Sequence, residues 1–331
     1  MEIALVFAVI AIALAFDYTN GFHDAANAIA TSVSTRALTP RVALCLAAVM
    51  NLAGALVSEG VAGTIGSGII TPPDSPRGMA MVLAGLLGAI IWNLATWWFG
   101  LPSSSSHALI GGLIGAGAAG SVTVHWSVIT GKVLIPMVLS PLIGFGLAYG
   151  VMVGISWLFR RSSPQRVHRG FRAGQSVSAA ALAFGHGLQD AQKTMGVIVL
   201  ALVTAGLHTG HDVPLWVKLA AAGAIALGTY SGGWRIMRTL GRRVITLDPA
   251  RGVAADTTAS TVLYVMAIGM HAPVSTTHTI SSAIMGVGAT RRLSAVRWGV
   301  AGNIVTAWIL TIPMTAALAA LAYFLLSMAI R

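Results

Sequence analysis

Two short runs of hydroxyl side chains, each closed by a histidine, could bind ions in this chain of 331 residues. The run PSSSSH at residues 102–107 returns as PVSTTH at residues 273–278. Hydroxyl groups donate hydrogen bonds to anions and offer oxygen atoms to small cations, and the start of a helix adds free backbone N–H groups. We expect each proline to open a short helix after a break. The hydroxyl residues expected to bind are Ser104, Ser105, Ser106, Ser275, Thr276 and Thr277.

Two aspartates repeat in the same way. The segment NGFHDAANAIAT aligns with HGLQDAQKTMGV, which places Asp24 opposite Asp190 and Asn27 opposite Lys193. An ionised carboxylate at the centre of a membrane costs roughly 2.5 to 3.5 kcal/mol, so one that occurs twice predicts a function. We expect both aspartates to bind cations; the structural alternative is that each caps a broken half-helix. Lys193 either offsets the charge of Asp190 or extends to the interface.

The two motifs belong to one duplicated unit. A third and weaker pair, VAGTIG at residue 61 and IMRTLG at residue 236, follows in the same order. Matches in one order indicate that the whole unit was copied. The sequence predicts a first repeat at residues 1–159, a basic cytoplasmic linker at 160–172 and a second repeat at 173–331.

Composition indicates an integral membrane protein: 56% of the residues are hydrophobic, 9% are charged and the mean hydropathy is +0.81. We expect an all-α, multi-pass protein of the plasma or inner membrane, in contact with the lipid bilayer, because the alternating pattern of an outer-membrane barrel is absent. The net charge of +11 lies in short loops, so nucleic acid is not an expected partner. The apolar runs are 42–60, 79–100, 133–158, 195–207, 215–232 and 298–328.

The loop charges predict that the two repeats have opposite orientations. Arginines fill the linker at 160–172 and the loops at 235–251 and 291–297, and the positive-inside rule places these segments in the cytoplasm. The equivalent loops of the first repeat, 67–78 and 120–131, carry few basic residues. We expect each repeat to contain a broken crossing before and after its short loop, a re-entrant Ser/Thr hairpin and one long closing helix. Alternatively, the run 79–100 spans fully.

Other kinds of site are weaker interpretations. His107 and His278 either anchor the hairpins by hydrogen bonding or carry protons, and anchoring is the favoured interpretation. No metal site is expected, because no Cys/His/Asp group has ligand spacing along the chain. Ser105 with His107 could serve an intramembrane hydrolase, but one catalytic centre has no need of a duplicated motif. A channel lined by Ser, Thr and Gly is the other alternative.

The quoted segments, together with GTYSGGWRIMRTLG from Gly228, resemble the inorganic phosphate transporter (PiT) family, bacterial low-affinity type, over nearly the whole chain. The resemblance implies inverted repeats, transport of inorganic phosphate with Na+ or H+, and a homodimer. The resemblance also implies metal–phosphate complexes as the substrate of some bacterial members and sulfate as the substrate of one branch. The substrate-binding residues carried over are Asp24, Asn27, Asp190 and the six hydroxyl residues named above.

Departures from the family pattern concern the coupling ion. The second signature reads GLQD where GAND or GTND is usual; Asn51 stands where animal members have glutamate, and Asp256 where many bacterial members have glutamate. The expected coupling-ion residues are Asp24, Asn51, Ser104, Asp190 and Ser275, with no cofactor. Because two carboxylates in a low-dielectric site repel phosphate, cations must accompany it. The sequence thus predicts a secondary active phosphate symporter with alternating access around a midplane site, with sulfate as the nearest alternative substrate.

Overall fold

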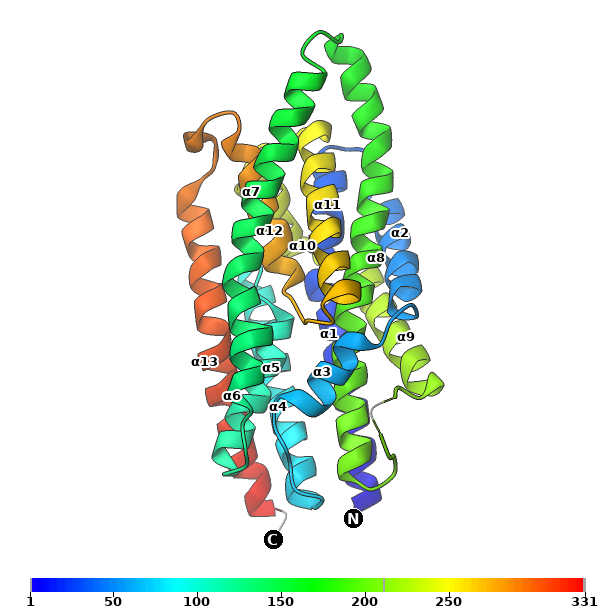
Figure 1. The fold of residues 1–331 in the computed structure, drawn as a ribbon, viewed down its shortest axis with the longest axis vertical. Helices are drawn as coiled ribbons and strands as arrows, with labels where there is room; N and C mark the ends of the chain where they lie inside the picture. The colour runs from blue at the N-terminus through cyan, green and yellow to red at the C-terminus, as the bar shows by residue number, and fades with distance from the viewer. Residues whose placement is uncertain (1, 211, 330–331) are drawn as a thin grey trace.

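Helices make up nearly the whole molecule (Figure 1). The computed structural model describes residues 2–210 and 212–329, and in that part of the chain the only β-type pairing is an isolated bridge between Ile70 and Val124. The prediction of an all-α protein is therefore confirmed. The helices are α1 (Glu2–Ser34), α2 (Pro40–Ala55), α3 (Gly60–Gly68), α4 (Pro76–Phe99), α5 (Ser105–Ala119), α6 (Trp126–Ile129), α7 (Ile135–Leu158), α8 (Pro164–Thr204), α9 (Leu215–Ser231), α10 (Trp234–Arg238), α11 (Pro249–Tyr264), α12 (Thr276–Ala289) and α13 (Trp298–Ala329).

Among the described residues, four helical segments are long and apolar enough to cross a membrane: Ile3–Ser34, Pro76–Phe99, Trp126–Leu158 and Trp298–Ala329. Some of their apolar side chains pack inside the protein, and the others lie on its outer surface. In the most apolar 18-residue stretches of Trp126–Leu158 and Trp298–Ala329, only 22% of the residues are buried inside the protein. Most of these side chains therefore lie on the outer surface. Such a surface is stable against lipid tails and would aggregate in water.

The helix breaks fall in the second crossing of each repeat. α2 ends at Ala55 before α3 begins at Gly60, and α9 ends at Ser231 before α10 begins at Trp234. The first crossings, α1 and α8, are continuous through the repeated aspartate segments, so the predicted break before the short loop is wrong. Neither segment contains a proline, so nothing in the local sequence forces an interruption of the helix. π-helical turns at Thr130–Leu134, Thr239–Arg243 and Val265–Gly269 add further irregularity.

The first helix of each repeat packs on the second helix of the other repeat. A β-carbon on Gly21 of α1 would lie 2.4 Å from the main-chain oxygen of Ile225 in α9. The equivalent Gly187 of α8 would place its β-carbon 2.1 Å from the main-chain oxygen of Asn51 in α2. Only glycine allows backbones to approach this closely. The two crossings therefore interlock the repeats around the segments that carry the aspartates.

Each hairpin likewise packs on the long closing helix of the other repeat. α4 and α5 occupy the lower half of the molecule in Figure 1, and α11 and α12 the upper half. α13 of the second repeat packs on α4 and α5, whereas α7 of the first repeat packs on α11 and α12. The N-terminal end of α1 and the C-terminal end of α13 lie at the end opposite the α7–α8 turn (Figure 1). The basic segment 160–172 is a tight turn followed by the first turns of α8.

Candidate functional site

Asp24 and Asp190 lie inside helices and are almost fully buried, with 1% and 0% of their surface exposed. Because both helices continue past them, neither aspartate caps a half-helix, which removes the structural alternative considered from the sequence. A buried carboxylate needs hydrogen bonds or a cation to replace its hydration. The partners of these two groups therefore define the site.

The hydroxyl runs lie at the N-terminal ends of α5 and α12, which begin directly after Ser104 and Ser275. Each motif's proline lies two residues before this N-cap, so the prediction that proline opens the helix is wrong. Ser104 Oγ accepts the backbone N–H of His107 at 3.2 Å, and Ser275 Oγ accepts that of His278 at 3.1 Å. Serine is a preferred N-cap because its oxygen satisfies a free helix donor. These two hydroxyls cap their helices.

The next hydroxyl of each run contacts the aspartate of its own repeat. Ser105 Oγ lies 2.6 Å from Asp24 Oδ2, and Thr276 Oγ1 donates to Asp190 Oδ2 at 3.3 Å. Ser105 Oγ also lies 2.6 Å from the amide oxygen of Asn20. The two hydroxyls occupy equivalent positions in the duplicated motifs, and so do the two aspartates. The same interaction therefore occurs once in each repeat.

The last hydroxyl of each run contacts the first helix of the other repeat. Asn27 Nδ2 donates to Thr277 Oγ1 at 2.8 Å, and Lys193 Nζ donates to Ser106 Oγ. Thr277 Oγ1 also lies 3.3 Å from Asp24 Oδ1. These bonds join both hairpin ends to both aspartate helices. Seven predicted substrate residues therefore meet in one buried group.

The two carboxylates and one imidazole form a cluster that suits a cation. Ligand atoms of Asp24, His186 and Asp190 all lie within 4.8 Å of one another, and the three residues are buried. His186 Nε2 lies 2.9 Å from Asp190 Oδ2, and its Nδ1 lies 3.1 Å from the amide oxygen of Asn51. Asn51, predicted as a coupling-ion residue, thus contacts His186. Sequence reasoning missed His186, although its position one helical turn before Asp190 placed it on the same face.

The two motif histidines pack against each other. The rings of His107 and His278 lie 4.8 Å apart in an edge-to-face arrangement, and His278 stacks on Trp308 at 4.0 Å. The indole N–H of Trp308 donates to the main-chain oxygen of Pro102 at 3.0 Å. Ring packing therefore anchors the hairpin ends, where the sequence predicted anchoring by hydrogen bonds.

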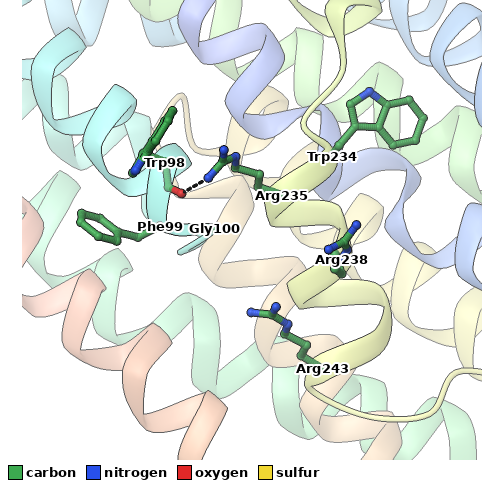
Figure 2. Close-up of a pocket in the computed structure, with 7 residues that line it drawn as sticks. All are labelled: Trp98, Phe99, Gly100, Trp234, Arg235, Arg238 and Arg243. Atoms are coloured by element: carbon green, nitrogen blue, oxygen red, sulfur yellow. Dashed lines mark hydrogen bonds between the residues drawn. The ribbon is translucent and has the colours of Figure 1, made fainter.

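A separate pocket of 350 Å³ lies beside α10 and the C-terminal end of α4. Figure 2 shows its arginines along one side and the aromatic end of α4 on the other. Arg235 donates to the main-chain oxygen of Trp98 at 2.7 Å, and its guanidinium lies 4.3 Å from the centre of the Trp98 ring. None of the aspartates belongs to this pocket. Its lining residues are Trp98, Phe99, Gly100, Trp234, Arg235, Arg238 and Arg243.

A helical membrane protein with two matching halves, broken helices and a buried charged centre has the architecture of a secondary transporter. The sequence profile of the Phosphate transporter family matches residues 20–166 and, a second time, residues 159–319. The chain belongs to this family, as the resemblance of its motifs indicated. It is a membrane transporter built from two repeats and not an enzyme.

Full-length relatives agree. A protein of Bacillus subtilis (strain 168), described as a probable low-affinity inorganic phosphate transporter, is 46% identical over 333 residues, covering 99% of each chain. A protein of Rhizobium meliloti (strain 1021) with the same description is 50% identical over 325 residues, covering 97% of this chain and 96% of the relative. A solved structure described as the sodium-dependent phosphate transporter aligns with a TM-score of 0.84 at 24% identity, over 98% of this chain and 99% of that chain. This likeness confirms the fold.

Proposed function

We propose that this protein takes up inorganic phosphate by symport with Na+ or H+. The observation that carries the proposal is the buried group in which Asp24 and Asp190 share one centre with hydroxyls from both hairpins. Two carboxylates attract cations and repel an anion, so phosphate binds there only together with positive charge. The descriptions of the Bacillus and Rhizobium relatives support phosphate as the anion.

Phosphate needs donors, and the site offers hydroxyl and amide groups for it. The hydroxyls of Ser105, Ser106, Thr276 and Thr277 lie at the hairpin ends, and the amide of Asn27 in α1 donates to Thr277. The N-terminal ends of α5 and α12 add partial positive charge directed toward the same centre. In this mechanism the carboxylates hold the coupling cation, while the hydroxyls and helix ends hold the anion.

Opposite orientation of the two repeats would give the site access from both faces. The arginine-rich segments around 160–172 and 291–297 lie at the same end of the molecule, the upper end in Figure 1. The positive-inside rule assigns this end to the cytoplasm, so α11–α12 enters from inside and α4–α5 from outside as re-entrant hairpins. Movement of one interlocked half against the other then opens the centre to each side in turn.

Uptake by purified protein in liposomes tests the proposal. We expect labelled phosphate to accumulate under an inward gradient of Na+ or of H+, and the effective gradient identifies the coupling cation. Asp24→Asn and Asp190→Asn each remove one carboxylate at constant size and should abolish accumulation. The matched control is Asp212→Asn, because the Asp212 side chain is 77% exposed and contacts only His208 among the ion pairs of the described residues. Accumulation by the protein that is insensitive to both gradients would refute symport.

Competition distinguishes phosphate from sulfate. Unlabelled phosphate should suppress uptake of labelled phosphate, and equal concentrations of sulfate should leave it unchanged at several pH values. Stronger competition by sulfate would assign the site to that anion instead. Normal uptake by either aspartate variant would remove that carboxylate from the mechanism.

A further inference from the structure

Lys193 is one of the positions at which the two halves of the site differ. It occupies in α8 the place that Asn27 occupies in α1, and both side chains donate to the equivalent hairpin hydroxyl, on Ser106 and Thr277. The two residues are therefore equivalent in the structure as well as in the sequence. At this position the first repeat has an amide and the second repeat has an ammonium group.

The additional contact of Lys193 is with the carboxylate. Its Nζ forms an ion pair with Asp190 Oδ1 and lies 3.3 Å from the main-chain oxygen of Val274. Asn27 makes no such contact with Asp24, whose Oδ1 lies 2.7 Å from His23 Nδ1. Lys193 is 1% exposed and is one of the largest fully buried side chains of the protein. A buried ammonium is costly unless it is paired, so this charge belongs with Asp190.

Counting charges shows what the lysine changes. Whatever charge the neighbouring His23, His186 and Asp17 carry, an amide in place of the ammonium would make the site more negative by one charge. Since phosphate adds further negative charge, the lysine lowers by one the number of cations that must enter with it. A fixed ammonium stays with the protein, whereas a bound Na+ or H+ is carried across.

We propose that Lys193 is a built-in substitute for one coupling cation and lowers the number of positive charges moved with each phosphate by one. This inference rests on the proposed symport. The competing explanation is that Lys193 only holds the hairpin end through Ser106 and the Val274 carbonyl. A structural anchor would affect stability and rate but not the charge moved per phosphate.

The test is Lys193→Asn, which reproduces the side chain of the other repeat. The ratio of charge to phosphate is read from the reversal potential of uptake in proteoliposomes under defined Na+ or H+ gradients. We expect the variant to move one more positive charge per phosphate than the unaltered protein. Lys218→Asn is the matched control, because Lys218 pairs with the partly exposed Glu59 away from the centre, and its ratio should stay unchanged. An unchanged ratio in Lys193→Asn overturns the inference.

A second measurement decides the question if the Lys193→Asn variant does not transport phosphate. Thermal unfolding of Lys193→Asn in detergent, followed over Na+ concentration and over pH, reports cation binding without transport. One cation bound more than in the unaltered protein supports the inference, and equal binding overturns it. If the unaltered protein fails to accumulate phosphate at all, the proposed function fails, while the binding measurement still decides the role of Lys193.

The pocket in Figure 2 carries an independent inference. Within the described part of the chain, Arg238 and Arg243 have no ion-pair partner, and no carboxylate lines the pocket. The opposite wall is aromatic, with Trp98 60% and Phe99 73% exposed. Guanidinium groups next to lipid are costly without an anion, and they bind phosphate oxygens in pairs. Exposed Trp beside Arg is typical of the membrane interface.

We infer that this pocket binds the phosphate headgroup of an anionic phospholipid in the cytoplasmic leaflet. The test is retention of phosphatidylglycerol by protein purified from vesicles of phosphatidylglycerol and phosphatidylcholine, measured by mass spectrometry. Changing Arg238 and Arg243 together to Gln should reduce retention severalfold. The control changes Arg291 and Arg292, which lie in the exposed turn before α13. Equal loss in both variants, or displacement of the lipid by inorganic phosphate, overturns the inference.

Discussion

Replacement of Gly187 by alanine tests whether the close crossing of α2 and α8 sets the position of Asp190. The added β-carbon would lie 2.1 Å from the main-chain oxygen of Asn51 and 2.7 Å from its carbonyl carbon. These are backbone atoms, so no side chain can rotate away to make room. Gly187 also neighbours His186, which contacts both Asn51 and Asp190. A shift at this crossing therefore reaches the carboxylate directly.

The size of the effect follows from the overlap. Ordinary contact between such atoms begins near 3.4 Å, so the two helices must separate by on the order of 1 Å. Overpacking of this kind costs about 1 to 3 kcal/mol of stability. Displacement by about 1 Å lowers enzyme rates on the order of 100-fold, and we expect phosphate uptake to fall by a similar factor.

The assay is the initial rate of labelled phosphate uptake in proteoliposomes, together with the thermal unfolding temperature in detergent. Gly170→Ala is the matched control, since Gly170 lies on the same helix and a β-carbon there meets nothing within 4 Å. We expect the control to keep normal uptake. Normal uptake by a folded Gly187→Ala variant would refute the reasoning, because the crossing would then not determine where Asp190 lies.

Three further substitutions test the hairpin ends. Ser105→Ala removes the hydroxyl 2.6 Å from Asp24 Oδ2; a hydrogen bond to a charged group contributes about 1.5 to 3 kcal/mol, so the cation concentration at half-maximal uptake should rise about 10- to 100-fold, and an unchanged value would contradict this role. Ser104→Ala removes the N-cap of α5 and should cost about 1 kcal/mol of unfolding free energy, with no loss of stability as the contrary result. Trp308→Ala removes the ring stacked on His278 and should cost about 3 to 5 kcal/mol, whereas Trp308→Phe should retain part of this in the same denaturation measurement.

The charged residues of the site could be predicted from the sequence because a buried charge is costly wherever it lies. Asp24 and Asp190 stood out in apolar surroundings, and the duplication identified their equivalence. The pairing of the hydroxyls required the structure. The motif spacing gave no reason why Ser105 should meet Asp24 of its own repeat while Ser106 meets Lys193 of the other. That division depends on how the hairpins enter the bundle.

The helix breaks were predicted less well, and the reason is physical. Gly and polar residues around Asp24 suggested a broken helix, but tertiary partners satisfy the carboxylate and the helix continues. Local propensity is a weak predictor where packing supplies such partners. Similarly, His186 lies one helical turn before Asp190 but far from Asp24 in the sequence. It joins the two aspartates only because α1 and α8 lie together in the fold.

The sequence by itself determined that the protein lies in a membrane, that it contains a duplication, and which kinds of residue form its buried centre. Composition and repeated motifs are properties of the chain alone. The tertiary structure decided which of these residues meet. Glycine crossings interlock the two repeats, bring two carboxylates within 4.8 Å and place Lys193 beside only one of them. That arrangement sets the electrostatic energy of the buried charges, since electrostatic energies depend on distance and burial.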